Sequence, residues 1–336
     1  MDSSSVLQPI VQIHPTRRCN LRCLHCYSVS GPGEHDLLAY EVLEQCLTDA
    51  RTEGYTVASF SGGEPILYRG LERLLWHAKG LGMRTTVTSN GMLLTGARLA
   101  ALTGCTDVLA ISLDGVPESH NRMRACDRAF EGMRSKLEGV RKSGIDFGFI
   151  FTLTLYNVNE VEWAAQFAAE QGAKLLQIHP LEEVGRAAAK LLGARPDEVE
   201  SAYAYLEAER IRRKYGNRLF VQLDIFHRNL MVRHPERFYA AEEPAPRLAD
   251  CVTPLVVEAD GTVVPLGYGF GRQYALGSLL NEGLRELARR WRASGYSQFR
   301  ELCRRVYGAA CQPAELPFLN WYELIGAQSV SSQPTV

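Results

Sequence analysis

The sequence has no hydrophobic run near the roughly 18 to 20 residues that a membrane-spanning helix needs. Its first residues are small and polar, so it also lacks the basic and apolar segments of a secretory signal. Its 37 basic and 38 acidic residues nearly cancel, which leaves no field to attract phosphate backbones or an anionic membrane surface. These absences argue against a membrane protein and a nucleic-acid coat. They predict a cytoplasmic protein with no nucleic-acid or membrane partner.

The sequence also lacks the even number of cysteines expected of a disulfide framework, because it contains nine. Nine cysteines are many for a reducing compartment, which indicates metal or redox chemistry. Three of them lie within eight residues of one another, namely Cys19, Cys23 and Cys26. This cluster is the strongest functional signal in the composition.

Short β-rich runs alternate with longer helical patterns over the first two thirds of the chain. The periodicity predicts strands near 10–13, 57–61, 84–88, 107–113, 146–153 and 174–179, and helices near 37–53, 70–81, 96–103, 127–143, 159–171 and 197–214. Six βα units in succession predict an α/β fold with a parallel sheet. Right-handed crossovers would close the sheet into an open, partial (β/α)6 TIM-like barrel.

The pattern changes after residue 218. A β-rich run follows, and residues 255–264 form a hairpin pattern whose Asp260-Gly261 pair is a turn signal. We therefore divide the chain into a partial barrel (1–218), a smaller α+β region packed on its open end (219–326) and a disordered tail (327–336).

The three clustered cysteines follow the first predicted strand, at the end of the barrel where reactive groups gather. Thiolates hold iron–sulfur clusters, and three thiolates on a four-iron cluster leave one iron open for a substrate or cofactor. A structural zinc site needs a fourth ligand. His25 is a candidate, but it lies between two of the cysteines and cannot easily reach the same metal. The spacing alone favours a cluster and leaves zinc or ordinary buried cysteines open.

The Cys-x3-Cys-x2-Cys spacing resembles the signature of the radical S-adenosylmethionine (radical SAM) enzymes. Four further segments agree with that family in their order and in their places at strand ends: Ser61-Gly62-Gly63-Glu64-Pro65, Ser89-Asn90-Gly91, Ser112-Leu113-Asp114-Gly115 and His120-Asn121-Arg122-Met123-Arg124. The first of these resembles the family's GGEP segment and the last its HDxxR stretch. The resemblance implies that Cys19, Cys23 and Cys26 hold a 4Fe-4S cluster and that the chain binds S-adenosylmethionine (SAM).

The resemblance also implies roles for the residues after the second and third strands. Gly62 and Gly63 would let backbone carbonyls approach the amino group of SAM, because glycine has no Cβ atom. Glu64 and Pro65 would fix that turn. Asn90 would line the pocket.

Further SAM contacts are implied after the fourth strand. Ser112 and Asp114 would hydrogen-bond the ribose or the methionine carboxylate, and Arg124 would bind that carboxylate with its planar fork. Arg122 is the alternative for this last role. Ala125 stands where the family often has glycine, which leaves the local backbone open.

The end of the sixth strand carries Gln177, Ile178 and His179. By the same resemblance these residues would form the adenine wall or contact the substrate. We assign Ile178 to the cofactor site, because family members often use backbone contacts there.

The segment from Cys251 to Leu266 resembles the first half of the SPASM or twitch domains that carry auxiliary clusters. Leu266 stands where that pattern needs a thiolate, and Val306 interrupts the later run from Cys303 to Cys311 in the same way. The region is therefore a degenerate SPASM-like one. Cys251, Cys303 and Cys311 either hold one auxiliary cluster with an open iron or are remnants in a fold that survives by packing alone.

The resemblance predicts an enzyme that cleaves SAM reductively to a 5′-deoxyadenosyl radical, which abstracts hydrogen from a substrate. No residue is identified as the catalytic hydrogen or proton donor. SPASM-like regions often accompany peptide-modifying enzymes, so we expect natural-product biosynthesis by maturation of a ribosomally made peptide. The alternative is a small-molecule step in nucleoside, sugar or tetrapyrrole biosynthesis. A noncatalytic iron–sulfur electron-transfer module is the alternative of another class.

The same reading predicts two protein partners. An external one-electron donor of flavodoxin or ferredoxin type would reduce the cluster. Only nine residues precede the first predicted strand, so a peptide substrate predicts a separate leader-recognition protein. Residues 285–305 contain seven arginines, which either bind an acidic partner or leader peptide or form a solvated helix face.

Overall fold

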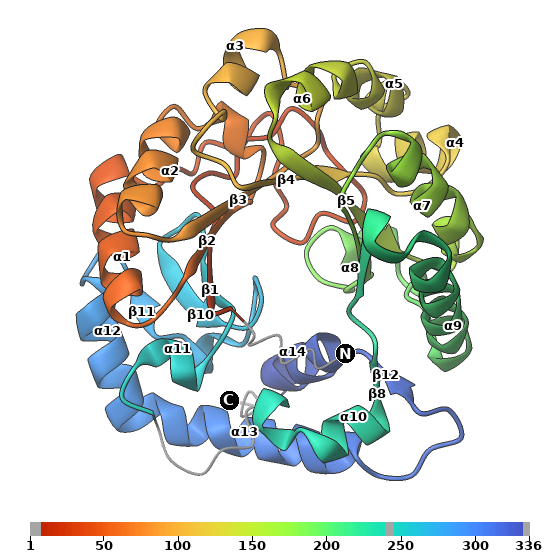
Figure 1. The fold of residues 1–336 in the computed structure, drawn as a ribbon. Coiled ribbons are helices and arrows are strands. Elements are labelled where there is room, and N and C mark those ends of the chain that lie inside the picture. Colours follow the sequence, from red (N-terminus) through yellow and green to blue (C-terminus); the bar gives the residue numbers. More distant parts are fainter. Residues whose placement is uncertain (1–7, 239–244, 332–336) are drawn as a thin grey trace.

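The computed structural model describes residues 8–238 and 245–331. Its centre is a curved sheet with helices around its outer face, as Figure 1 shows. Seven strands run parallel in chain order: β1 (Ile10–Ile13), β2 (Val57–Phe60), β3 (Arg84–Ser89), β4 (Val108–Ser112), β5 (Asp146–Leu153), β6 (Leu175–Pro180) and β7 (Phe220–Leu223). The first six lie where the periodicity predicts them. The predicted α/β class and parallel sheet are confirmed.

The helices between these strands cover the outside of the sheet, except the short α8, which lies within the ring of strands in the view of Figure 1. They are α1 (Tyr40–Thr52), α2 (Leu71–Gly80), α3 (Gly96–Ala100), α4 (Pro117–Arg124), α5 (Ala129–Arg134), α6 (Leu137–Ser143), α7 (Val161–Glu170), α8 (Ala187–Lys190) and α9 (Glu198–Tyr215). The predicted helix 127–143 is two helices, which a turn at Ser135 and Lys136 separates. Among the described residues, every helix is too short or too polar to cross a membrane.

Side chains alternate between the two faces of the sheet, as the pleat requires. Those that point to the helices are apolar and fully buried, as Ile13, Phe60 and Phe149 illustrate. Those that point into the ring of strands are largely polar and include Gln12, Ser59, Thr86, Thr88, Gln177 and His179. The sheet therefore has an apolar core on its outer face and a polar, partly exposed inner face.

The C-terminal third extends the same sheet rather than forming another. β9 (Leu255–Val257) pairs in parallel with β1, and β10 (Thr262–Pro265) and β11 (Gly277–Ser278) follow in antiparallel order. The predicted hairpin is thus confirmed. Since β7 lies on one side of residue 218 with its partner β6 on the other, the sheet joins both predicted regions. The division between them stays a prediction.

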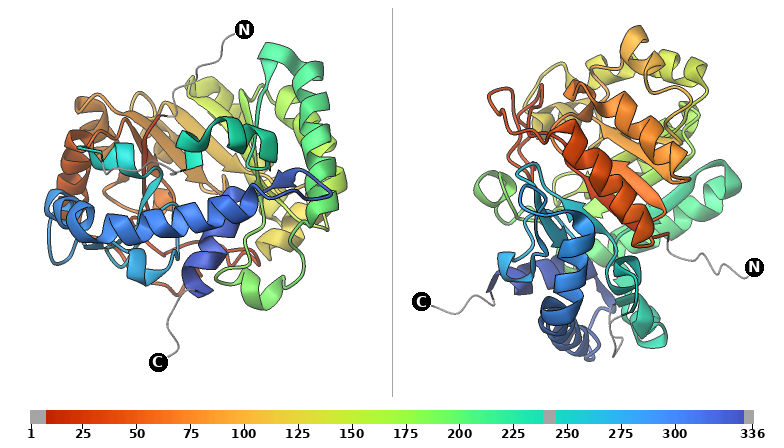
Figure 2. Two further views of the ribbon diagram at one scale, coloured as in Figure 1. Left: turned by 90° about the horizontal axis from the view of Figure 1, so that it is seen from below. Right: turned by 90° about the vertical axis from the view of Figure 1, so that its left-hand side faces the viewer.

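The remaining elements span the gap between the two edges of the sheet, as the two views of Figure 2 show. They are α10 (Arg228–Arg233), α11 (Leu248–Cys251), α12 (Leu284–Arg290), a π-helical turn (Trp291–Gly295), α13 (Tyr296–Ala310), α14 (Trp321–Ser331) and the two-stranded pair β8 (Phe226–His227) with β12 (Phe318–Leu319).

The predicted disordered tail is wrong over residues 327–331, which form the last part of α14. Ser329 is fully buried, its hydroxyl accepts a hydrogen bond from the backbone N–H of Gly271 (2.9 Å), and its carbonyl accepts one from Gln273 (2.6 Å). Residues 332–336 lie outside the described residues.

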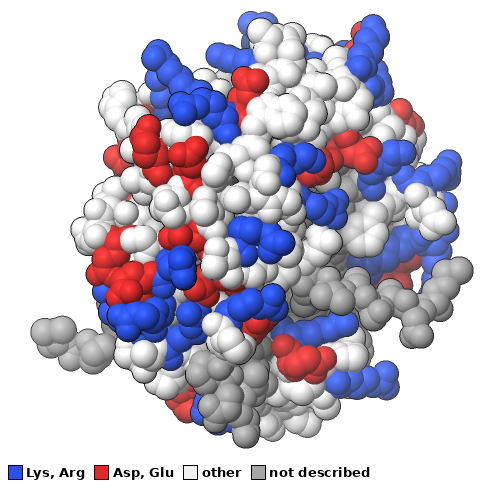
Figure 3. All heavy atoms as spheres, turned by 60° about the vertical axis from the view of Figure 1, so that its left-hand side comes forward, with Lys and Arg blue, Asp and Glu red and all other residues white. Residues whose placement is uncertain are grey.

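Acidic and basic side chains lie interspersed on the face shown in Figure 3, which includes α1 and α12. Several arginines of the 285–305 segment pair with acids of their own chain: Arg289 with Glu286, Arg290 with Glu282 and Arg292 with Glu53. These three guanidinium groups are already neutralised. They therefore do not support a basic surface for an acidic partner.

Candidate active site

The loop between β1 and α1 carries Cys19, Cys23 and Cys26 at the carboxyl end of the sheet. It folds back on itself through isolated β-bridges between Thr16 and Leu37 and between Arg18 and Gly31. We call residues 14–39 the cysteine loop. Three other parts of the chain hold it in place.

The first support is the glycine pair after β2. The backbone N–H of Gly63 donates to the carbonyl of Thr16 (2.9 Å), and that of Glu64 donates to the carbonyl of Arg18 (2.9 Å). A Cβ atom on Gly63 would lie 2.3 Å from the Arg18 carbonyl oxygen, and Gly62 has a φ of +112°. The path of the cysteine loop therefore already requires glycine at both positions, independently of the SAM contact that the sequence implies for them.

The second support is Arg186, which the sequence analysis missed. Its guanidinium donates to the carbonyls of Cys23 (2.7 Å) and Ser30 (2.8 Å), and its backbone N–H donates to the carbonyl of Cys26 (2.9 Å). The preceding Gly185 has a φ of +59°, and a Cβ atom there would lie 2.2 Å from the Tyr27 carbonyl oxygen. A lone Gly-Arg pair after a strand gave no local signal of this distant role.

The third support is α4, because the carbonyl of Met123 accepts a hydrogen bond from the backbone N–H of Leu24 (2.8 Å). This bond places the segment between two of the cysteines against the helix that ends in Arg124. It also surrounds His25 with protein, and burial lowers the pKa of its imidazole to about 4.

Each sulfur of the three cysteines has at least one nitrogen donor near it. The donors are the backbone N–H of Leu21 (3.4 Å) and the side-chain amide of Asn90 (4.0 Å) for Cys19, the guanidinium of Arg124 for Cys23 (3.8 Å) and the backbone N–H of Ser30 for Cys26 (3.3 Å). Such donors stabilise thiolates that ligate metal.

Burial raises the pKa of two of these thiols, that of Cys19 to about 12. A metal cluster must therefore displace protons when it binds, as thiolate sites generally require. Among the described residues, no three His, Cys, Asp or Glu side chains are grouped to hold one metal ion. An iron–sulfur cluster binds one thiolate at each of several irons, so its ligands need not converge on one ion. Three thiols spread along a loop, each with an N–H donor near its sulfur, fit such a cluster.

Glu64 joins the ends of β2 and β3. Its carboxylate accepts a hydrogen bond from the backbone N–H of Asn90 (2.9 Å), and the Asn90 side chain donates to the side-chain oxygen Oδ1 of Asn20 (2.8 Å). Glu64 is fully buried, and burial raises its pKa to about 7 in spite of the Asn90 hydrogen bond. The contacts agree with the turn-fixing role implied by the sequence for Glu64 and place Asn90 beside Cys19.

Asp114 and Arg124, predicted separately as SAM contacts, form a buried ion pair with Nε and Oδ2 2.6 Å apart. Burial alone would raise the pKa of Asp114, but the guanidinium outweighs it and holds that pKa below its usual range. The same guanidinium reaches the sulfur of Cys23. The two residues thus belong to one network with a cluster ligand, while Arg122 lies at the surface over the ring of Tyr156.

Ala125 adopts the left-handed conformation that glycine would take there, with φ +50° and ψ +44°. It caps the C-terminus of α4, and its backbone N–H donates to the carbonyl of Arg122 (3.1 Å). The backbone at Ala125, which the sequence left undetermined, therefore follows the path that glycine would take. The Cβ atom of alanine is strained in this conformation.

Ser112 is buried at the end of β4, two residues before Asp114 in the sequence. Ile178 of β6 is fully buried in the apolar core, and its carbonyl accepts a hydrogen bond from the backbone N–H of Asp224 (3.1 Å). The side chain of Ile178 points to the helices, so the contact that the resemblance implies with the cofactor would come from its backbone and stays a prediction. Its neighbours Gln177 and His179 point to the inner face of the sheet instead.

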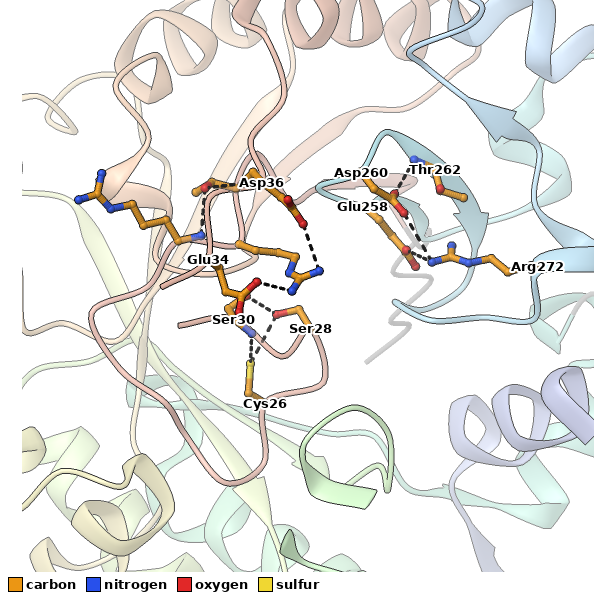
Figure 4. Close-up of polar contacts among 12 residues, drawn as sticks. Cys26, Ser28, Ser30, Glu34, Asp36, Glu258, Asp260, Thr262 and Arg272 are labelled. Carbon is orange, nitrogen blue, oxygen red and sulfur yellow. Dashed lines mark hydrogen bonds and ion pairs between the residues drawn. The ribbon is translucent and has the colours of Figure 1, made fainter. Parts of the chain in front are cut away.

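Tyr268 belongs to the glycine-rich segment after β10 and packs on the cysteine loop. Its ring centre lies 5.0 Å from that of His14 and 5.4 Å from that of Tyr27. Figure 4 shows two polar networks in this area: Ser28 and Ser30 at the sulfur of Cys26, with Glu34 and Asp36 nearby, and Glu258, Asp260 and Arg272 at the β9–β10 turn. The C-terminal third therefore covers part of the cysteine loop.

The three C-terminal cysteines pack in or against one apolar core. Cys251 at the end of α11 and Cys303 within α13 are buried in the apolar core, whereas Cys311 follows α13 and is half-buried. Leu266 and Val306, at the positions of the missing ligands, are buried in the same core. An auxiliary cluster on these cysteines stays a prediction.

Residues 13–168 match the family model described as the Radical SAM superfamily. The chain is 30% identical over 181 residues to Fe-coproporphyrin III synthase of Methanosarcina barkeri. The aligned region covers 53% of this chain and 45% of that protein. The chain is 25% identical over 205 residues to the sporulation killing factor maturation protein SkfB of Bacillus subtilis, which covers 61% of this chain and 50% of that protein. The chain thus spans about half the length of the curated relatives it matches.

Among solved structures, anSMEcpe with bound AdoMet and the Kp18Cys peptide has a TM-score of 0.65 and 19% identity to this chain. The match covers 95% of each of the two chains, so the fold is shared over almost the whole length. The family model covers the cysteine loop and the strand ends that surround it. Residues 13–168 of this chain therefore form a domain of the Radical SAM superfamily.

Proposed function

We propose that this protein is a radical SAM enzyme whose Cys19, Cys23 and Cys26 hold a 4Fe-4S cluster. The observation that carries the proposal is the cysteine loop itself: three cysteines at the carboxyl end of a parallel sheet, each with a nitrogen donor at its sulfur. When bound, the cluster and SAM supply a 5′-deoxyadenosyl radical that removes a hydrogen atom from the substrate.

The chain's own residues bind and orient the cofactors. The SAM pocket comprises residues at the ends of β2, β3 and β4 and the end of α4: Gly62, Gly63, Glu64, Pro65, Asn90, Ser112, Asp114 and Arg124. Asp114 holds Arg124 in place by their buried ion pair, which leaves other guanidinium N–H groups for Cys23 and for the SAM carboxylate. Glu64 keeps the β2 and β3 ends together so that this pocket is formed before a ligand enters.

We propose a ribosomally made peptide as the substrate, supported by the similarity to SkfB, a maturation protein of the sporulation killing factor. The open end of the sheet and its polar inner face would admit an extended chain. A tetrapyrrole is the second candidate, favoured by the 30% identity to Fe-coproporphyrin III synthase. Titration with Fe-coproporphyrin III separates the two, because a tetrapyrrole enzyme shifts the Soret band on binding and a peptide enzyme does not.

The proposal includes a cytoplasmic location, an external one-electron donor of flavodoxin or ferredoxin type and, for a peptide substrate, a separate leader-recognition protein. The test of the chemistry needs none of these. Anaerobically reconstituted protein, dithionite and SAM should yield 5′-deoxyadenosine and methionine, and the Cys26→Ala variant should yield neither. A noncatalytic electron-transfer module would bind iron but form no 5′-deoxyadenosine, and this result would refute the proposal.

A further inference from the structure

A histidine–aspartate pair lies inside the ring of strands, where the sequence implies an adenine or substrate contact for the histidine and no role for the aspartate. His179 is the penultimate residue of β6, and Asp224 follows β7 directly. The two strands are hydrogen-bonded neighbours, and the backbone N–H of Asp224 donates to the carbonyl of Ile178 (3.1 Å). The pair therefore lies at the carboxyl ends of two parallel strands, where active sites of such sheets form.

The geometry of the pair orients the imidazole. Nδ1 of His179 contacts Oδ2 of Asp224, and the side-chain amide of Gln222 donates to the other oxygen, Oδ1 (3.2 Å). Both carboxylate oxygens are thus occupied, which fixes Nδ1 as the nitrogen facing the carboxylate. Within residues 8–238 and 245–331, Nε2 of His179 has no hydrogen-bond partner and is not sealed from solvent.

The side chains of the pair are accessible to different degrees, 34% for His179 and 15% for Asp224. A salt bridge with only a structural role has no need of an open imidazole nitrogen. An imidazole whose Nδ1 is held by a carboxylate and whose Nε2 is open has the arrangement of a general base or acid.

Titratable groups of the segment after β6 and of α14 lie near the pair. Glu182 follows β6, and Tyr322 and Glu323 belong to α14, where Glu323 pairs with Arg195. Desolvation lowers the pKa of His179, but Asp224, with a smaller contribution from Glu182, outweighs it and raises that pKa above its usual value. Desolvation raises the pKa of Asp224, but His179 outweighs it and lowers that pKa, so the aspartate stays ionised.

We propose that His179 is the catalytic proton-transfer residue on the inner face of the sheet and that Asp224 is its positioning residue. The inference rests on the proposed function and adds the group that it lacks. The proton moves from an N–H, O–H or S–H of the substrate to Nε2 of His179, and the bonding pair stays on the substrate atom. Asp224 keeps its charge throughout, and this transfer needs no oxidant. The substrate fragment beside β6 and β7 therefore carries an exchangeable proton.

The test uses diethyl pyrocarbonate, which modifies neutral, accessible imidazole nitrogens, on the full-length reconstituted protein between pH 5.5 and 8.5. Peptide mass spectrometry follows His179, with exposed His35 as the reactive reference and buried His120 as the unreactive one. We expect His179 to react at alkaline pH at a rate comparable to His35, with a midpoint above 6.5, the usual imidazole pKa.

Asp224→Asn should move the His179 midpoint to lower pH by about one unit, which is about a tenfold gain in neutral imidazole well below the midpoint. Gln222→Ala, which removes the hydrogen bond to Oδ1 and leaves the carboxylate charge in place, should shift the midpoint by less, and it serves if the first variant does not fold. An unreactive His179, or a midpoint that neither variant moves, overturns the inference. Formation of 5′-deoxyadenosine by the same preparation tests the proposed function separately, so failure of one is distinguishable from failure of the other.

Discussion

Removal of the Arg186 guanidinium should loosen the cysteine loop without unfolding the sheet. The side chain donates to two backbone carbonyls of the loop, those of Cys23 (2.7 Å) and Ser30 (2.8 Å). A hydrogen bond with a charged donor contributes about 1.5–3 kcal/mol, and Arg186 is only half-buried, which places each bond at the low end. Arg186→Ala should therefore favour loop opening by about 2–3 kcal/mol, or roughly 30- to 150-fold, since about 1.4 kcal/mol is a factor of ten.

The assay is the rate at which a thiol reagent labels Cys23 and Cys26 in the metal-free protein, resolved by peptide mass spectrometry. Local opening limits this rate when closing is fast relative to labelling. Cys105, which is fully buried in the core, reports global unfolding and should keep its wild-type rate. Arg186→Lys should show an intermediate rate, because an ammonium cannot bridge both carbonyls as the planar fork does.

Arg122→Ala is the matched control, since Arg122 is an exposed arginine whose guanidinium lies over the Tyr156 ring, 5.0 Å from its centre. It should leave the labelling of all three thiols unchanged. Equal labelling of Cys23 in wild type and Arg186→Ala would refute the assignment of Arg186 as a support of the loop.

Three further predictions concern stability and metal binding. Ala125→Gly should stabilise the apoprotein by about 0.5–1 kcal/mol in denaturant unfolding, because φ is +50° there; a loss of stability would contradict the strain. Gly63→Ala should abolish iron binding, because its Cβ would lie 2.3 Å from the Arg18 carbonyl oxygen, whereas Gly80→Ala, with nothing within 4 Å, should bind iron normally. Burial raises the pKa of Glu64 from 4.5 to about 7, so between these pH values the folded apoprotein holds a proton that the unfolded chain has lost. The free energy of unfolding should therefore fall by up to about 3 kcal/mol as the pH rises from 4.5 to about 7. Unfolding at pH 5 and 8 should show this loss in wild type and not in Glu64→Gln, and equal slopes would contradict it.

Much of the barrel could be predicted because its signals are local. Each strand from β1 to β6 alternates or runs apolar over a few residues, and each following helix has its own apolar stripe. The end of α14 could not be predicted in this way, since Ala327 and Ser329 read as a polar tail by composition. They are helical because the hydroxyl and carbonyl of Ser329 meet groups 58 and 56 residues away in sequence.

The site residues also divide into those that the sequence could locate and those that it could not. Contiguous motifs located the cysteine loop and the strand ends, but the sequence could not show that Asp114 and Arg124 would pair with each other. Arg186 and Asp224 gave no signal in the sequence, because their partners are not local. Ser30 is 156 residues from Arg186. His179 belongs to β6, and Asp224 follows the neighbouring strand β7. Such residues become visible only once the topology brings strand ends together.

The most direct test of the central claim is the iron and sulfide content of the anaerobically reconstituted protein beside the triple variant Cys19→Ala, Cys23→Ala, Cys26→Ala. The account predicts about four irons and four sulfides per wild-type chain, as one cubane cluster requires, and almost none at this site in the variant. If Cys251, Cys303 and Cys311 hold a second cluster, about eight irons should fall to about four. An iron content that the triple substitution leaves unchanged, or a colourless wild-type protein, would contradict the claim that the cysteine loop is a cluster site.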